Sequence, residues 1–427
     1  MNIMQGFGSR VYFIALIGVM VVLWGRTVTA QTGNSCVDCH AGLTIERLRT
    51  PAASFTEDIH YQKEFSCQDC HGGDPSTGHD AERAHDRAKG FRGAPRPSEI
   101  PALCAGCHSD VELMKRFNPK LRVDQMLEYR SSHHGKALAE GDDHVATCTS
   151  CHGIHGIRPI GDSRSPVYRT NVSTTCGECH GNDAHMRPYG IPTDQAQQYR
   201  SSVHGVKLLD EGDLAAPTCN NCHGNHGATP PGLSSISQVC GECHANNRDF
   251  FNASPHKAAF AELGLADCII CHGHHDIQFS TDAMLGVGED ALCITCHAEG
   301  DNGYIAAATM ASALDTLKLT LAEAHTKIQR AQRGGVKVAG GRFDLHDADA
   351  ALIKARTAVH HFNVEKFRAI IDEGLASARI VIDQGDRALN DLRMRRVGLA
   401  FTIPLILLVA VLLTLKIRQI ERSRIHR

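Results

Sequence analysis

The chain has 427 residues, of which 5% are aromatic and one is Trp, yet it contains 18 Cys and 27 His. A chain of this length would ordinarily form two or three domains, but its large side chains are too few to fill their interiors. We therefore expect a group other than side chains to occupy that space. The formal net charge of −3 gives no reason to expect a nucleic acid or an acidic partner.

Residues 1–30 have the pattern of a secretory signal peptide. Arg10 precedes an apolar stretch from Val11 to Trp24, and the segment ends in the small-residue sequence Val28-Thr29-Ala30. The apolar stretch is too short to span a bilayer, which disfavours an uncleaved anchor. We therefore expect the rest of the chain to be exported.

Every cysteine falls in a Cys-x-x-Cys-His motif, and nine such motifs lie within residues 31–303. Two thiols at this spacing can both form thioethers with one porphyrin, and the next residue then lies below the iron as its proximal ligand. Disulfides, zinc knuckles and redox CxxC pairs would not require that histidine. The motifs predict nine covalent haem c groups, attached at Cys36 and Cys39, Cys67 and Cys70, Cys104 and Cys107, Cys148 and Cys151, Cys176 and Cys179, Cys219 and Cys222, Cys240 and Cys243, Cys268 and Cys271, and Cys293 and Cys296. The corresponding proximal ligands are His40, His71, His108, His152, His180, His223, His244, His272 and His297.

A repeat within this domain predicts the ligands on the other side of the iron. Tyr-Arg-Ser-Ser-x-His-Gly occurs at 129–135 and 199–205, and each copy leads to Cys-x-x-Cys-His-Gly-x-His and then to a second Cys-x-x-Cys-His. A looser copy begins at Phe251, and a degenerate copy begins at His60. The four copies predict four two-haem units, which follow the leading haem at Cys36–His40. Two histidine positions outside the motifs recur, and we expect them to be distal ligands: His60, His134, His204 and His256 before the first motif, and His155, His226 and His275 after it.

Two distal ligands are still missing from this count. In the first unit Asp74 replaces the expected histidine, with His79 and His85 as alternatives. The C-terminal region offers His325 and the pair His360-His361, and helical periodicity cannot choose between the pair. Of these we expect His325 and His361 to serve. Met114 and Met186 occupy matching repeat positions and are expected to pack rather than to bind iron.

The predicted fold is mostly α and irregular, with porphyrins in place of an apolar core. Residues 304–395 form a helical region, in which a Gly-rich break at 334–341 separates helix patterns from Ile305 to Arg333 and from about Leu345 to Met394. Asp344 is a candidate N-cap of the second helix. We expect these helices to fold back on the last haem units, since no clean heptad supports a freestanding coiled coil.

Residues 397–415 carry no charge and are long enough, at 1.5 Å per residue, to span roughly 28 Å as a transmembrane helix. Residues 416–427 form a basic tail that is expected to be cytoplasmic. Together with the signal peptide, this predicts a single-pass protein on the periplasmic face of a bacterial inner membrane.

The segment from Cys67 to Pro75, the Tyr-Arg-Ser-Ser-x-His-Gly repeat and Cys-x-x-Cys-His-Gly-x-His resemble the doubled-CxxCH multihaem cytochromes of the class III cytochrome c group. The resemblance implies low-potential bis-histidine haems, a periplasmic location, and as partners a quinol-oxidising or cytochrome b/iron–sulfur complex, or a periplasmic redox protein. The expected function is to relay electrons between a quinol-linked membrane complex and a periplasmic or respiratory acceptor. The alternative is an oxidoreductase of the nitrite, hydroxylamine or tetrathionate type, which needs one haem with an open position.

Overall fold

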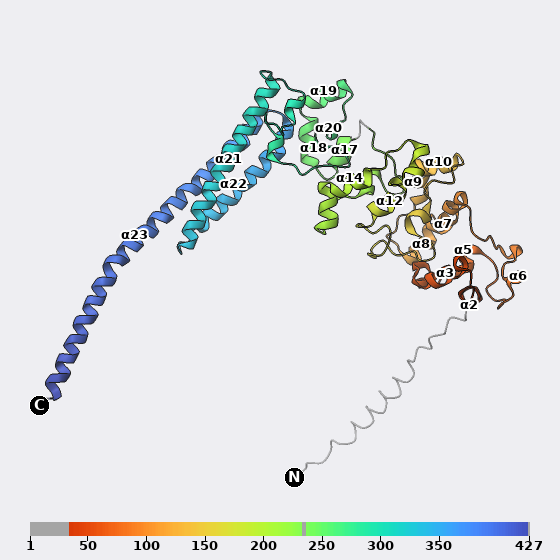
Figure 1. Cartoon of the computed structure of the whole chain (residues 1–427), viewed down its shortest axis with the longest axis horizontal. Coiled ribbons are helices and arrows are strands. Elements are labelled where there is room, and N and C mark those ends of the chain that lie inside the picture. Colours follow the sequence, from red (N-terminus) through yellow and green to blue (C-terminus); the bar gives the residue numbers. More distant parts are fainter. Residues whose placement is uncertain (1–33, 233–235, 426–427) are drawn as a thin grey trace, which may run out of the picture. The chain divides into compact units, whose positions relative to one another are not determined.

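The computed structural model describes residues 34–232 and 236–425 (Figure 1). Within these ranges every regular element is a helix, and they contain no β-strand. The prediction of a mostly α and irregular chain is therefore confirmed. The signal segment at 1–30 lies outside the described residues.

The chain divides into two compact units, residues 1–193 with 218–229, and residues 194–217 with 230–427. The described part of the first unit contains short helices joined by loops and turns. Its helices are α2 (Ser35–Ala41), α3 (Glu46–Ser54), η1 (Phe55–Glu57), α4 (Ile59–Gln62), α5 (Cys67–His71), α6 (Ala81–Ala84), η2 (Arg87–Lys89), η3 (Pro97–Glu99), α7 (Ile100–His108), α8 (Val111–Phe117), α9 (Gln125–Ser131), α10 (His133–Ala139), α11 (Cys148–His152), α12 (Val172–His180), α13 (Asp183–Met186), η4 (Arg187–Tyr189) and α16 (Cys219–His223).

The apolar core of the first unit is small. Its buried apolar side chains are few, and among them are Met114, Leu138, Val172 and Met186. A unit of this length ordinarily buries many more, because apolar burial is the main favourable term in folding. The small core agrees with the expectation that a group other than side chains fills the interior. Met114 and Met186 are buried, as expected for methionines that pack rather than bind iron.

The second unit begins with short helices of the same kind and ends in long ones. The short elements are α14 (Gln195–Ser201), α15 (Val203–Gly205), η5 (Val206–Asp210), α17 (Ile236–Gly241), α18 (Ala245–Asn252), α19 (Pro255–Leu263), α20 (Ile269–His272), η7 (Asp282–Met284) and η8 (Cys293–Thr295). The long elements are α21 (Asn302–Arg333), α22 (Ala339–Ala358) and α23 (Val364–Ile425), with the single turn η9 (Val359–His361) between the last two.

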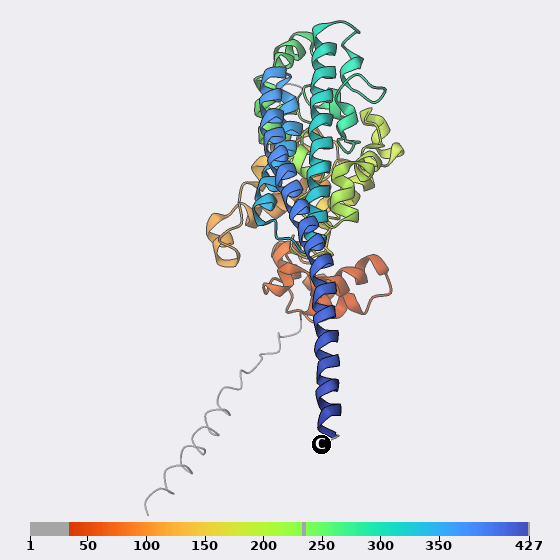
Figure 2. The same ribbon diagram turned by 90° about the vertical axis from the view of Figure 1, so that its left-hand side faces the viewer.

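The three long helices pack into a bundle with an apolar core. Leu314 and Leu317 of α21, Ala355 of α22, and Phe367 and Ile371 of α23 meet in it, each at most 2% exposed. The leucine, isoleucine and phenylalanine side chains each contribute about 1.5–3 kcal/mol when buried. Figures 1 and 2 both show α21 and α23 running side by side. The bundle contacts α18 through α22 and η9, so these helices fold back on the segment of their own unit that carries the Cys-x-x-Cys-His motifs.

The helix boundaries differ from the predicted ones at two places. The second helix begins at Ala339, before the expected N-cap, and Asp344 inside it accepts a hydrogen bond from Gln384 Nε2 at 2.6 Å. The predicted helix to Met394 is also broken into α22 and α23. The break occurs at Phe362, whose φ of 48° lies in the left-handed region and ends the preceding helical turn.

The apolar segment predicted to cross a membrane lies in the C-terminal part of α23 (Figure 2). By length and hydropathy both α21 and α23 could span a bilayer. In α21 the buried side chains face the bundle, whereas the side chains of 397–415 are all exposed. Their exposure leaves this apolar surface without a covering element inside the described chain.

Candidate haem-binding sites

Most of the Cys-x-x-Cys-His motifs lie in helices. α5, α11 and α16 each consist of one motif alone, while α7 and α12 end on theirs. Residues three apart lie on the same side of a helix, so both thiols of a motif face the same way. Capping residues begin α5, α11 and α16, namely Ser66, Thr147 and Thr218. The glycine that follows has a positive φ at Gly72, Gly153, Gly224 and Gly273, which ends the turn directly after the motif histidine.

Motif histidines face a second histidine at a nearly constant separation. In the four repeat copies, the ring centres of the pairs are 6.0, 6.1, 6.3 and 6.0 Å apart for His60–His108, His134–His180, His204–His244 and His256–His297. Each of these pairs joins the histidine before a unit's first motif to that unit's second motif. The repeat therefore places a distal candidate within its own copy.

A second set of pairs joins neighbouring copies. His71 faces His155 at 5.8 Å and His152 faces His226 at 6.1 Å between ring centres, so the first motif of one copy meets the second recurrent histidine of the next. The histidine of the leading motif and the first motif histidine of the last copy each face a histidine that lies outside the recurrent positions. His40 faces His85 at 6.0 Å, and His272 faces His360 at 6.0 Å.

These separations fit an iron between two imidazoles. Two metal–nitrogen bonds of about 2 Å, and roughly 1 Å from each nitrogen to its ring centre, give about 6 Å between ring centres. A face-to-face stack brings two rings closer, as in the 4.0 Å stack of His361 on Phe250. The paired histidines and the adjacent thiols thus have the spacing that haem c requires.

Burial keeps most paired histidines in the form that binds metals. It lowers the pKa of nine of them below the usual value, and the facing histidine lowers several of these pKa values further: His108, His134, His152, His155, His180, His204, His226, His256 and His272. Burial lowers the pKa of His360 as well. The neutral imidazole is the ligating species, so these sites are prepared for iron at neutral pH.

Hydrogen bonds at the other ring nitrogen orient several of these imidazoles. Nδ1 of His71 lies 2.8 Å from the Gly93 carbonyl oxygen, and Nδ1 of His360 lies 3.0 Å from that of Thr357. Nδ1 of His40 lies 3.2 Å from the Leu48 carbonyl oxygen. When Nδ1 donates to a carbonyl, Nε2 is the nitrogen left to bind the metal.

Three residues of the Tyr-Arg-Ser-Ser-x-His-Gly repeat have a structural role that the contacts explain. The Tyr129 hydroxyl donates to the carbonyl of Ala146, just before the next motif, and Ser132 caps α10 by accepting from the Gly135 amide at 2.9 Å. A Cβ at Gly135 would lie 1.9 Å from the Tyr129 carbonyl oxygen, so only glycine allows this close approach. The second copy repeats these contacts with Tyr199 and Gly205.

Thiols of consecutive motifs influence one another within each unit. Hydrogen bonds join Cys104 to Cys148, Cys176 to Cys219, and Cys240 to Cys268, and the first of them raises the pKa of the Cys104 thiol. Elsewhere burial raises the thiol pKa, and a thiol of the neighbouring motif raises it further, in the pairs Cys67 and Cys36, Cys70 and Cys107, Cys151 and Cys179, and Cys271 and Cys293. The attachment points therefore follow one another in sequence order, six in the first unit and three in the second.

Two histidines that the sequence favoured lie in other surroundings. Nε2 of His325 is 2.9 Å from Asp349 Oδ1, and His361 stacks on Phe250. The structure instead brings His85 and His360 to motif histidines. Both residues were open alternatives in the sequence, but neither helical periodicity nor motif spacing distinguished them from His79 and His361.

His223 and His275 are the two remaining predicted ligands. His223 is the proximal residue of the sixth motif, and burial lowers its pKa. His275 follows α20 at the same spacing that His155 and His226 have in their copies. With His85, His360 and His275, the candidate distal ligands number nine, equal to the number of motifs.

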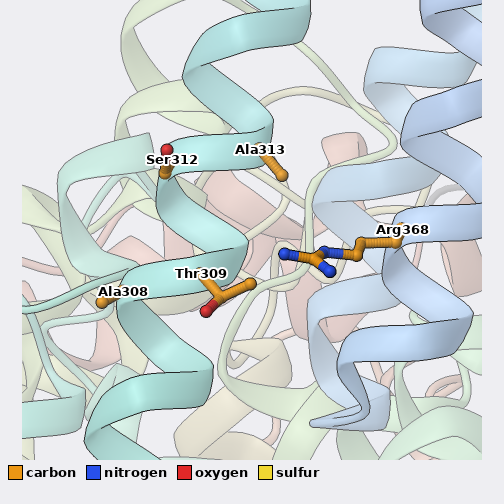
Figure 3. A pocket seen from close by; sticks show the side chains of 5 residues that line it. All are labelled: Ala308, Thr309, Ser312, Ala313 and Arg368. Carbon is orange, nitrogen blue, oxygen red and sulfur yellow. The ribbon is translucent and has the colours of Figure 1, made fainter.

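A groove between α21 and α23 has a different character. It encloses about 410 Å³ and is lined by Ala308, Thr309, Ser312 and Ala313 of α21 and by Arg368 of α23 (Figure 3). The Arg368 side chain reaches from α23 toward α21. Because the lining contains no thiol and no imidazole, the groove does not belong to the candidate haem sites.

Comparisons with known proteins find similarity to c-type cytochromes. The family model of cytochrome c3 matches residues 59–181, and that of cytochrome c554 and c-prime matches residues 239–318. The multiheme cytochrome MtrA of Shewanella baltica is 26% identical over 151 residues, which cover 34% of this chain and 32% of that protein. The C-type polyheme cytochrome OmcC of Geobacter sulfurreducens is 24% identical over 227 residues, covering 44% of this chain and 26% of that protein. The chain thus spans about a third or less of the length of these relatives, and no solved structure matches it significantly.

Proposed function

We propose that this chain, which is a multihaem c-type cytochrome, binds nine haems and relays electrons between a quinol-linked membrane complex and a periplasmic or respiratory acceptor. The proposal goes beyond the family in three respects: the number of haems, the direction of exchange with a membrane complex, and the attachment to the membrane. The observation that carries it is the set of eight facing histidine pairs.

Haem c supplies a one-electron iron couple when it is bound, and the chain determines what that couple can do. The motif cysteines would hold each porphyrin covalently. A second histidine opposite the motif histidine would occupy the sixth position of the iron, leaving no position for a substrate. A closed site of this kind exchanges electrons and needs no catalytic side chain, which favours a relay over an enzyme.

The contacts between consecutive motifs support transfer along the chain. In the first unit hydrogen bonds join thiols of motifs three and four and of motifs five and six, and in the second unit those of motifs seven and eight. Between the other consecutive motifs, a thiol of one motif raises the pKa of a thiol of the next. Each thiol would be bonded to the edge of its porphyrin, so the hydrogen-bonded thiols would bring the edges of their two porphyrins close. Electrons could then move within a unit by short steps in sequence order.

The apolar segment 397–415 supports a place of action at a membrane. The exposed apolar side chains of 397–415 match a hydrocarbon core in length, and basic residues follow them. We propose that α23 anchors the chain in the inner membrane with its C-terminus in the cytoplasm and the haem-binding region on the periplasmic side. A quinol-oxidising or cytochrome b/iron–sulfur complex would be reached in the membrane, and a periplasmic redox protein in solution.

Spin-state spectroscopy tests the closed coordination. The full chain, isolated from membranes with its haems, should contain only low-spin ferric iron and should not bind carbon monoxide after reduction. Intact-mass analysis should find nine porphyrins per chain. A stoichiometric high-spin haem that binds the gas would contradict the relay and support the oxidoreductase, because that chemistry requires an open position.

A further inference from the structure

The residue two positions before the distal histidine differs between repeat copies. In three copies it is a serine, at 132, 202 and 254. Each serine hydroxyl donates to the backbone carbonyl three residues earlier, at distances of 2.6, 2.7 and 2.7 Å. In the first copy the same position holds Asp58, a residue of different charge and length.

Asp58 contacts the distal imidazole of its own copy. Its Oδ1 lies 2.9 Å from Nδ1 of His60 and accepts the backbone amide of His60 at 2.8 Å. Its Oδ2 accepts the backbone amide of Ile157 at 2.8 Å. Because a carboxylate can only accept a hydrogen bond, Nδ1 of His60 carries the proton and donates to Asp58, which leaves Nε2 as the nitrogen that can bind a metal.

The environment of this carboxylate makes its charge effective. Asp58 is 2% exposed, so water screens it little, and three N–H groups hold it in place. Two other carboxylates approach ligand candidates less closely. Glu128 Oε2 is 3.7 Å from Nδ1 of His226, and Asp301 Oδ1 is 3.4 Å from Nδ1 of His297, and both carboxylates are 31% or more exposed.

We propose that Asp58 is a positioning residue that lowers the reduction potential of the haem between His60 and His108 relative to the matching haems of the other three copies. The inference rests on the proposed ligation by His60. A carboxylate that accepts the Nδ1 proton makes the imidazole a stronger electron donor, and its buried negative charge favours ferric over ferrous iron. The serines at this position bond to the backbone and supply no such charge.

Asp58 also connects this site to the neighbouring one. Ile157 lies two residues after His155, which faces His71, and the Ile59 amide donates back to the Ile157 carbonyl at 2.8 Å. The same carboxylate therefore fixes the loop that carries a second distal candidate. Its hydrogen bond to an imidazole, however, is made to His60 alone, so the largest effect belongs to the haem at that residue.

Redox titration of the full haem-loaded chain with Asp58→Asn tests this inference. The expected result is a rise of one haem's midpoint potential by about 59 mV or more, a tenfold change in its ratio of ferric to ferrous iron. Asp58→Ser introduces the residue of the other copies and should give the same rise if the asparagine variant folds poorly. The ferric paramagnetic resonance signal of that haem should change while remaining low-spin.

Glu128→Gln is the matched control, since it removes a carboxylate that is farther from its histidine and more exposed. Its shift should be clearly smaller than tenfold. Unchanged midpoint potentials in low-spin Asp58→Asn and Asp58→Ser would overturn the tuning role while leaving the relay intact. Loss of stability with no change in any potential would likewise reduce Asp58 to a structural residue. A gas-binding haem in the unaltered chain would instead contradict the relay itself.

Discussion

His360 and His361 are adjacent, but the turn η9 directs their side chains to different neighbours. The ring of His360 faces His272 at 6.0 Å, and its Nδ1 is held by the Thr357 carbonyl. The ring of His361 stacks on Phe250 at 4.0 Å, too close for a metal to lie between them. Local backbone geometry at one turn therefore separates a ligand candidate from a packing residue.

This pair gives a test of the site at the residue scale. We expect His360→Ala to convert one haem to the high-spin form, because its iron loses the sixth ligand. His361→Ala removes an adjacent ring of the same type and should leave all haems low-spin. Ferric absorption and paramagnetic resonance spectra of the two full-length variants provide the measurement. High-spin iron in His361→Ala, or identical spectra for both variants, would refute the assignment.

The sequence predicted ligand candidates where a motif or a repeat fixed their position. His134 and His204 follow from the repeat because the same tyrosine, serine and glycine place them. His85 has no second copy with which to compare it, since the leading motif stands outside the repeat. His360 depends on a turn whose left-handed Phe362 no propensity predicts, so only the three-dimensional structure distinguishes it from His361.

At the level of the elements, the three-helix bundle is the part of the chain with an ordinary apolar core. Gly374 of α23 shows how closely the helices approach, since a Cβ there would lie 2.8 Å from Ala351 Cβ and 3.1 Å from Leu317 Cδ1. Asp282 of η7 adds ion pairs to Lys318 of α21 and Arg356 of α22. The bundle is thus joined to the haem-binding segment by charge as well as by apolar contact.

Two leucines of α21 separate the contribution of this core from that of helix propensity. Leu317 is fully buried, and Leu319 is 74% exposed on the same helix. Leu317→Ala should lower the free energy of unfolding of the bundle by about 2–5 kcal/mol, because it leaves a cavity between three helices. Leu319→Ala should change it by less than about 0.5 kcal/mol.

Hydrogen exchange of the amides in α22 measures this difference in the full chain, since it reports local opening separately from loss of haem. Faster exchange in Leu317→Ala alone is the expected result. Equal protection in the two variants would mean that the bundle is not stabilised by this core.

On the scale of the whole molecule, the two kinds of structure in the chain have different causes. Apolar periodicity predicted the long helices, although not the turn between α22 and α23. The haem-binding region has little periodicity, because short turns around each motif, rather than long amphipathic helices, place its side chains. For this region the sequence therefore predicted only the distal histidines that recur in the repeat, and not the rest of the three-dimensional arrangement.

The proposed attachment to the membrane can be separated from the haem-binding function by shortening the chain. A variant that ends at Arg396 loses the exposed apolar part of α23 but keeps the buried residues of the bundle, the last of which is Ala388. Since no described residue covers 397–415, we expect the variant to keep its haems and its low-spin spectrum. It should appear in the soluble periplasmic extract, whereas the full chain should require detergent for release. Fractionation followed by haem staining measures both. If the shortened chain remains with the membrane, its anchor lies elsewhere, and residues 1–30 become the next segment to test.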